Sequence, residues 1–497
     1  MLAYGLLAST SRGKPSNRCR GIVRERFAAI PSPVCLRRCS IFGARTGVFR
    51  IQERRNGLRA SFVAEPMTSA TQPAFENGAH HRARLAQARE MTDALFPLIR
   101  PEALYDRPIP ERHRLIFYLG HLEAFDWNLI RGQFAAEQFH PDFDNLFAFG
   151  IDPVDGGLPS DQPKDWPRET DVCVYNAEAR ARVDQLISET EDVLVHVAIE
   201  HRLMHAETLS YLMHQLPLED KRADTQNSVE FRPLQKPRTV EVPGGLATLG
   251  QRRDEGVFGW DNEFETVSVA VPGFSADAFP VTNAQFLEFV RQGGYQQRSL
   301  WSHDDWAWKE KSGLSQPFFW LRFGEDWHLR TMFAEIPLPP DWPVFVSHAE
   351  ASAYAEWTGK RLPTEMQWHR MAYGTPSGVE QLYPWGGSKP HRGRGNFDFA
   401  RWDPAPVQSF PEGASAFGVF DLLGNGWEWT STPFQPLPGF QQFPFYPGYS
   451  ANFFDGKHYV MKGGSSRTAA CMLRRSFRNW FQPHYPYVYA KFRCVEE

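Results

Sequence analysis

Residues 193–216 contain neither glycine nor proline and repeat their apolar residues at helical spacing, which predicts one long helix. His201 and His205 lie four positions apart in it. Residues four apart share one face of a helix, about 6 Å apart along its axis. Two imidazoles placed in this way can bind one metal ion. Because two ligands rarely hold a metal alone, a third is needed, and His121 in another helical stretch is the best candidate.

The spacing of these residues alone does not decide which of them bind a metal. The chain has 16 histidines, so a pair four apart also arises by chance. Glu123, Glu200 and Glu207 are alternative ligands. If they are not ligands, they are exposed charges on the helix, or they accept a hydrogen bond from the N–H of a ligating imidazole.

The N-terminal half has the pattern of a helical bundle, which is a fold that builds metal sites from inward-facing side chains. A long loop rich in proline, glycine and aspartate, 152–168, separates the second helix from the third. We assign 79–217 to the bundle and the polar stretch 218–238 to a linker. The predicted helices cover 80–96, 110–134, 169–187 and 193–216.

Segment 1–78 differs from the rest of the chain in its amino-acid composition. Its first 60 residues hold 12 arginines and two acidic residues, Glu25 and Glu53. Such a composition resembles an organellar transit peptide, or translated upstream sequence with Met67 as the true start. We expect disorder there and assign it no function.

Composition excludes several classes of partner. The net charge of −4 gives no general attraction to nucleic acid. No apolar run approaches the ~20 residues that span a bilayer, so no membrane partner is expected. Three of the six cysteines lie in segment 1–78, and the other three are too scattered for a disulfide framework. A reducing cytoplasm is therefore the expected compartment.

From residue 239 to 497 the chain has the pattern of an α+β domain, with short strands and long loops. Aromatic residues make up 14% of the chain, which suits irregular backbone packed by large rings. Residues 240–250 predict a hairpin. Helices are predicted over 282–291, capped by Thr282 or Asn283, and over 347–357, capped by Ser347.

Short motifs follow one another in this half, at 279–286, 359–368, 383–386, 423–430, 462–465, 474–480 and 492–493. In this order they resemble the formylglycine-generating-enzyme (sulfatase-modifying factor) domain, a C-type-lectin-like fold. That enzyme uses two close cysteines after its Gly-Gly-Ser motif. Here the loop 465–476 holds only Cys471, so that activity is not expected.

A DinB-like four-helix bundle joined to this domain resembles the sulfoxide synthases of ergothioneine biosynthesis. The resemblance implies that His121, His201 and His205 bind non-haem Fe(II). It also implies that the enzyme uses O₂ to join a cysteine thiol to C2 of hercynine (trimethylhistidine) and to oxidise the sulfur to a sulfoxide. Hercynine, cysteine and O₂ are the expected partners.

The same resemblance assigns roles in the C-terminal half. Tyr446, in the stretch Tyr-Pro-Gly-Tyr-Ser, matches the catalytic tyrosine, with Tyr449 as its neighbour. Asn479 and Trp480 match hercynine-binding positions, where an amide can hold a carboxylate and an indole face can attract a trimethylammonium group. Packing is the alternative role for Tyr446 and Trp480.

The chain departs from mycobacterial-type members at three positions. Phe481 and Tyr485 replace an aspartate and an arginine that grip γ-glutamylcysteine, so we predict free cysteine as the preferred donor. Met204 replaces a glutamine before the third histidine, so the contact with hercynine must differ in detail. Trp427 and Trp429 are predicted to lie in the core. Asn425 and Glu428 brace a loop or bind Ca²⁺.

Three competing functions remain. A 5-histidylcysteine sulfoxide synthase of the ovothiol pathway uses a similar three-histidine iron. Such enzymes usually carry a C-terminal methyltransferase domain, whereas this chain ends at Glu497. A zinc-dependent thiol transferase would need no O₂. A ligand-binding module without activity would need no metal.

Overall fold

The computed structural model describes residues 78–148, 158–222 and 236–497. Segment 1–78, which was predicted to be transit-like, lies outside the described residues except for Gly78. Most of the predicted linker, 218–238, also lies outside them. The described start of the linker is anchored, because Lys221 Nζ donates to the carbonyls of His214 and Met332 at 2.9 Å each.

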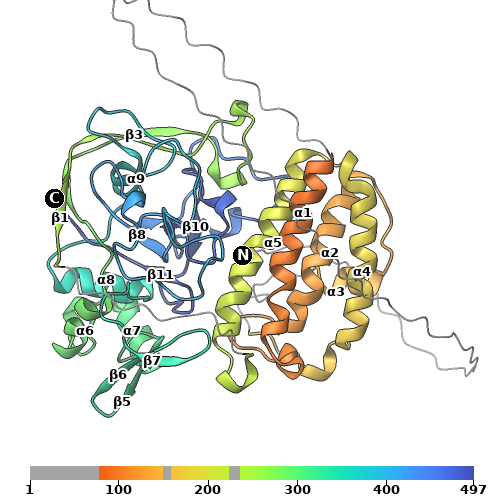
Figure 1. The fold of residues 1–497 in the computed structure, drawn as a ribbon, viewed down its shortest axis with the longest axis horizontal. Coiled ribbons are helices and arrows are strands. Elements are labelled where there is room, and N and C mark those ends of the chain that lie inside the picture. Colours follow the sequence, from red (N-terminus) through yellow and green to blue (C-terminus); the bar gives the residue numbers. More distant parts are fainter. Residues whose placement is uncertain (1–77, 149–157, 223–235) are drawn as a thin grey trace, which may run out of the picture. The chain divides into compact units, whose positions relative to one another are not determined.

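The first part of the chain is helical, as predicted. Its long helices run side by side in Figure 1, and the pairs α2–α4, α1–α5 and α2–α5 pack against each other. A short helix, α3, was not predicted. The helices are α1 (Gly78–Asp93), α2 (Leu115–Gln133), α3 (Pro141–Leu146), α4 (Glu169–Leu186) and α5 (Asp192–His214).

Helix α2 begins five residues later than predicted. Arg114 has extended backbone, with ψ at 155°, and its side chain donates to the Tyr105 carbonyl at 2.6 Å and to Asp161 Oδ2 at 3.0 Å. These bonds hold 110–114 as a loop that leads into the helix. Arg112 belongs to this loop.

A buried ion cluster joins α2 to α5. Arg202 is fully buried, and its guanidinium donates to Asp126 Oδ2 at 2.6 Å, to Glu123 Oε1 at 2.9 Å and to the Leu122 carbonyl at 2.9 Å. Arg202 follows His201 directly, so the cluster fixes how α5 is rotated against α2.

The C-terminal part combines short strands with helices. Two central strands, β8 (Trp427–Pro433) and β9 (Tyr459–Lys462), lie between β10 (Asn479–Phe481) and β11 (Ala490–Lys491). Smaller sheets surround them, in the orders β1-β4-β12, β2-β3 and β5-β6-β7. Their strands are β1 (Thr239–Val242), β2 (Gly245–Leu249), β3 (Val267–Val271), β4 (Phe274–Asp277), β5 (Trp320–Phe323), β6 (Asp326–Arg330), β7 (Glu335–Pro337) and β12 (Val495–Glu496).

The predicted hairpin over 240–250 is wrong. β1 pairs with β4 and β2 pairs with β3, both antiparallel. Pro243 and Gly244 bend one long strand instead of reversing it, and Gly244 packs against Gly273, where the facing strand bends. The partner of both halves therefore comes from residues 267–277.

Helix α6 (Asn283–Arg291) is capped by Thr282, and α8 (His348–Trp357) is capped by Ser347, both as predicted. Helices α7 (His303–Ser312) and α9 (Glu365–Tyr373) were not predicted. Buried rings such as Trp260, Trp368 and Trp429 fill the interior between loops, as the aromatic content predicts. Among the described residues, no helix is both long and apolar enough to cross a membrane.

We predict that Arg202→Met lowers the free energy of unfolding by about 3–5 kcal/mol, because the carboxylates of Asp126 and Glu123 would stay buried without their central cation. Urea denaturation of the metal-free protein measures this loss. The control is Arg168→Ala, which removes an arginine that pairs with Asp171 on the surface and should leave the midpoint unchanged. Equal midpoints for Arg202→Met and the native chain would contradict the role of the cluster.

Candidate metal centre and substrate pocket

Three histidines from two helices meet inside the bundle. His121 lies on α2, and His201 and His205 lie one turn apart on α5. One nitrogen from each lies within 4.8 Å of the other two, and Nε2 of His201 is 3.1 Å from Nε2 of His205. Two nitrogens about 2.1 Å from one ion at a right angle would be about 3.0 Å apart. The geometry therefore fits a metal ion.

Each ring is held by its surroundings. His121 Nδ1 donates to the Phe147 carbonyl at 2.7 Å, so Nδ1 carries the proton and Nε2 is left to act as a ligand. His201 stacks on Phe125 with centroids 3.4 Å apart, and His121 stacks on Phe117 at 4.8 Å. A Cβ atom on Gly120 would lie 2.5 Å from the Phe147 ring. Glycine there lets Phe147 approach closely.

Burial keeps the imidazoles neutral. The three residues are 2%, 0% and 3% exposed. Burial lowers the pKa of His121 to about 4, and it holds the pKa values of His201 and His205 well below the usual range. Neutral imidazole is the form that binds metals, so no proton has to leave before an ion enters.

The carboxylates that were predicted as alternative ligands instead accept hydrogen bonds from other side chains. Glu123 belongs to the Arg202 cluster. Glu200 accepts from Trp260 Nε1 at 2.9 Å and from Arg474 at 2.7 Å. Within the described part of the chain, the three histidines are the one group of three or more His, Cys, Asp or Glu close enough to share an ion.

Glu207 also joins α5 to the C-terminal part. It accepts from Trp427 Nε1 at 2.7 Å, from Thr468 Oγ1 at 2.7 Å and from Ser465 Oγ. The three acidic residues are therefore buried structural groups, which corrects the prediction of exposed charges or imidazole acceptors. Their spacing on the helix gave no sign of these distant partners.

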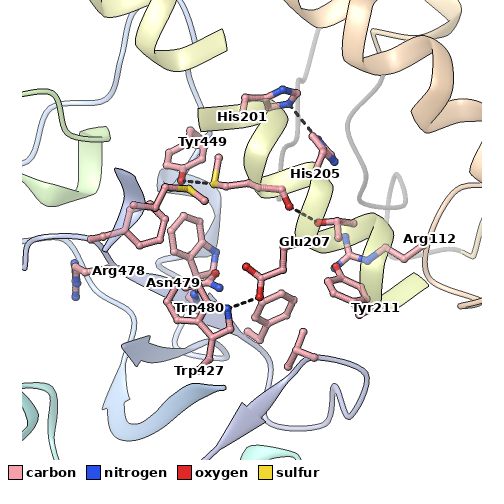
Figure 2. Close-up of a pocket in the computed structure, with 16 residues that line it drawn as sticks. Arg112, His201, His205, Glu207, Tyr211, Trp427, Tyr449, Arg478, Asn479 and Trp480 are labelled. Carbon is pink, nitrogen blue, oxygen red and sulfur yellow. Dashed lines mark hydrogen bonds between the residues drawn. The ribbon is translucent and has the colours of Figure 1, made fainter. Parts of the chain in front are cut away.

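A pocket opens beside two of the histidines and brings both halves of the chain together (Figure 2). His201, His205 and later residues of α5 form one wall. The lining comprises Arg112, His201, Met204, His205, Glu207, Thr208, Tyr211, Trp427, Tyr449, Met472, Phe477, Arg478, Asn479, Trp480, Phe481 and Val488.

Four residues with predicted substrate roles thus lie in this lining. Trp480 stacks on Phe434 with centroids 4.1 Å apart, and its buried Nε1 has no hydrogen-bond partner among the described residues. Asn479 Oδ1 accepts from the backbone N–H of Trp480 at 2.9 Å. Tyr449 stacks on Trp260 at 4.0 Å and donates to Met204 Sδ at 3.6 Å. The fourth, Phe481, stacks on Tyr485 at 5.2 Å.

Tyr446 lies beside the metal centre but does not line the pocket. It is 1% exposed, and its ring centroid is 5.2 Å from that of Phe125 and 6.4 Å from that of His201. Tyr485 lies just behind the lining, where its hydroxyl accepts from Arg112 Nε at 2.8 Å. Sequence reasoning did not find Arg112, because nothing in the local pattern relates residue 112 to residue 485.

The residues of the 423–430 motif divide between core and site. Trp429 is fully buried, as predicted, whereas Trp427 is buried but also lines the pocket. Asn425 braces a loop, since it accepts from Ala405 N–H at 2.7 Å. Both oxygens of Glu428 accept from Arg493, so Glu428 serves an ion pair and the Ca²⁺ alternative has no support.

Comparison with known proteins agrees with this architecture. Residues 225–497 match the sulfatase-modifying factor enzyme 1-like domain family. A hercynine oxygenase of Mycolicibacterium smegmatis is 37% identical over 328 residues, which cover 63% of this chain and 75% of the relative. The hercynine oxygenase of Mycolicibacterium thermoresistibile is also 37% identical, over 63% of this chain and 71% of the relative. Ergothioneine biosynthesis protein 1 of Neurospora crassa is 28% identical, over 80% of this chain and 55% of the relative.

Replacing His121, His201 or His205 singly by alanine should lower metal affinity by about 100-fold or more, since even the loss of a ligand's hydrogen-bond partner costs about 10–100-fold. Metal content after dialysis, measured by mass spectrometry, checks this. His303→Ala, at an exposed position of α7, is the matched control. Full metal content in His201→Ala would contradict the site.

Proposed function

The chain belongs to the hercynine oxygenase family and carries a sulfatase-modifying factor enzyme 1-like domain, and we propose that it joins the thiol of cysteine to C2 of hercynine. One molecule of O₂ is consumed. One of its oxygen atoms forms the sulfoxide of the product, and the other leaves as water with the thiol hydrogen and the C2 hydrogen. The product is hercynylcysteine sulfoxide.

The observation that carries this proposal is the shared wall between metal centre and pocket. His201 and His205 line the same cavity as Asn479 and Trp480. His121, His201 and His205 would hold Fe(II) through neutral imidazoles. Bound Fe(II) would supply the redox chemistry and a positive charge that lowers the pKa of a nearby thiol.

The aromatic wall suits the trimethylammonium group of hercynine. Phe434 covers one face of the Trp480 indole, so a cation would approach the face that lies toward the pocket. Such a contact contributes about 0.5–2 kcal/mol. The Trp480 N–H and the Asn479 amide are the donors for the hercynine carboxylate. This preference for a methylated amine argues against plain histidine, the substrate of the ovothiol-pathway alternative.

Tyr446 is the proposed donor of a proton or hydrogen atom to oxygen. Its ring neighbours both His201 and Phe125, so it lies on the metal side of the pocket wall. Tyr449 is less suited, because it is stacked on Trp260 and donates to Met204. Burial also raises the pKa of Tyr449 well above its usual value. We assign Tyr449 to shaping the hercynine site.

Cysteine is the proposed thiol donor, in preference to γ-glutamylcysteine. The stacked rings of Phe481 and Tyr485 occupy the positions where a charged glutamyl group would need partners. The two rings themselves offer a glutamyl zwitterion no ion pair that would replace its lost hydration. Free cysteine carries no such group.

Anaerobic loading with Fe(II), followed by O₂-uptake measurements, tests the function. We expect O₂ uptake that requires both hercynine and cysteine, with lower kcat/KM for γ-glutamylcysteine and for histidine in place of hercynine. A sulfoxide product identified by mass spectrometry completes the assignment. Product formation without O₂ would indicate a thiol transferase, and hercynine binding without turnover would indicate a binding module. Either result would overturn the proposal.

We predict that Tyr446→Phe lowers the rate of sulfoxide formation by about 100-fold or more, because proton transfer from a positioned side chain contributes about 10²–10⁴-fold. Metal content and hercynine affinity should stay unchanged. Tyr459→Phe is the control, because Tyr459 stacks on His348 outside the pocket lining. An unchanged rate in Tyr446→Phe would remove Tyr446 from the mechanism.

A further inference from the structure

Tyr446 and Tyr449 are the two ends of one tight turn. The backbone N–H of Tyr449 donates to the Tyr446 carbonyl at 3.4 Å. Between them lie Pro447 and Gly448, and Gly448 has a φ of 84°. Proline followed by glycine at positive φ is the pattern of a type II turn, whose conformation these two residues fix in advance. A contact at one end of this turn therefore also sets the position of the other end.

A buried hydrogen bond anchors the turn at its C-terminal end. Ser450 follows Tyr449 directly, and its Oγ donates to Asp261 Oδ1 at 2.6 Å. Ser450 and Asp261 are both 0% exposed. Because water cannot replace either partner, breaking this bond would leave a buried carboxylate oxygen without its donor. The bond therefore resists movement of the turn.

The residue before this carboxylate ties the turn to the metal centre. The Trp260 ring stacks on Tyr449 with centroids 4.0 Å apart and meets Tyr446 at 6.3 Å. Its Nε1 donates to Glu200 Oε2 at 2.9 Å. Glu200 directly precedes His201 on α5. Trp260 thus connects the two tyrosines to the part of the helix that carries a metal ligand.

The two anchors keep a fixed spacing. Trp260 and Asp261 are consecutive in a short turn, in which Glu263 Oε1 accepts from the Trp260 N–H at 2.9 Å. In the described part of the chain, Asp261 belongs neither to the pocket lining nor to the group that could share an ion. Any effect of Asp261 on the reaction therefore passes through the residue that it holds, Ser450.

We infer that Asp261, through its hydrogen bond to Ser450, is a positioning residue that holds the Tyr446 ring beside the metal centre. This inference rests on the proposed function, because Tyr446 is the proposed donor to oxygen. The Ser450 bond and the Trp260 stack together fix the orientation of the turn against α5. Loss of the bond leaves the stack on Tyr449 in place but frees the backbone that follows it.

Steady-state O₂ uptake by the Fe(II)-loaded chain tests the inference. Asp261→Ala and Ser450→Ala should each lower kcat by about 10–100-fold, since a misplacement of ~1 Å caused by a distant mutation can cost about 10²-fold. The double variant should lose no more than either single one, because both remove the same bond. KM for hercynine and the metal content should stay within about twofold.

Two further variants separate positioning from general support of the fold. Asp261→Asn should keep most of the native kcat, because its amide oxygen can still accept from Ser450. Asp455→Ala should leave kcat unchanged. This control fits because the Asp455 carboxylate also holds a loop, through a 2.9 Å bond from His458 Nδ1, but lies outside the pocket lining.

The Tyr446→Phe background gives the sharpest kinetic comparison. Once the Tyr446 hydroxyl is absent, its position no longer matters. Asp261→Ala should therefore cause no further loss of the residual rate. A purely structural effect of Asp261→Ala would persist in this background.

A second readout needs no turnover. With 3-fluorotyrosine at position 446 alone, the Zn(II)-loaded full chain should give one narrow ¹⁹F NMR line in the native and Asp261→Asn forms. The line should shift and broaden in Asp261→Ala and in Ser450→Ala, because the ring samples more than one position.

Four results would overturn the inference. They are an unchanged kcat in Asp261→Ala, a kcat in Asp261→Asn as low as in Asp261→Ala, an equal loss from Asp261→Ala in the Tyr446→Phe background, and an unchanged ¹⁹F line. Absence of hercynine-dependent O₂ uptake in the native chain would instead defeat the proposed function. The ¹⁹F comparison would then still decide whether Asp261 positions Tyr446.

Discussion

The site depends on a single helix, α5, that contacts both α2 and the C-terminal part of the chain. His201 and His205 face His121 across the bundle, and Arg202 holds α2 through its ion cluster. Glu200 and Glu207 are seven residues apart and lie on one face of the helix. Both bond to the C-terminal part of the chain. The rotation of α5 therefore fixes the metal ligands and the pocket wall together.

Burial of these charges is favourable only because each has matched partners. Burial raises the pKa values of Glu200 and Glu207, so their ionised forms rely on the donors around them. For Glu200 these donors are the Trp260 indole and the Arg474 guanidinium, which also pairs with Glu263. Removal of one partner would leave a buried charge behind. The same bonds that stabilise the fold thus hold Trp260 and Trp427 beside the pocket.

The sequence predicted the parts of the site that depend on local spacing. The i, i+4 pair His201 and His205 was visible because a helix places such residues on one face. Helix boundaries were predicted closely where capping residues or apolar periodicity marked them. The ordered motifs were enough to recognise the α+β domain and to select Asn479 and Trp480.

Features that depend on distant contacts could not be predicted in the same way. The hairpin prediction failed because strand pairing at 239–249 is set by residues 267–277. The Phe147 carbonyl that orients His121, and the Tyr485 hydroxyl that orients Arg112, come from segments with no sequence signal relating them. The acidic residues of α5 were predicted as alternative ligands, because their indole partners lie more than 50 residues away in the sequence.

X-ray absorption spectroscopy of the Fe(II)-loaded protein under anaerobic conditions tests the central claim most directly. The proposed function predicts iron coordinated by three imidazole nitrogens, from His121, His201 and His205, with one sulfur ligand added when cysteine binds in the presence of hercynine. A fall from three imidazole nitrogens to two in His121→Ala would be the matching change. A coordination shell of carboxylate oxygens without imidazole, or a shell that gains no sulfur with cysteine, would contradict the account.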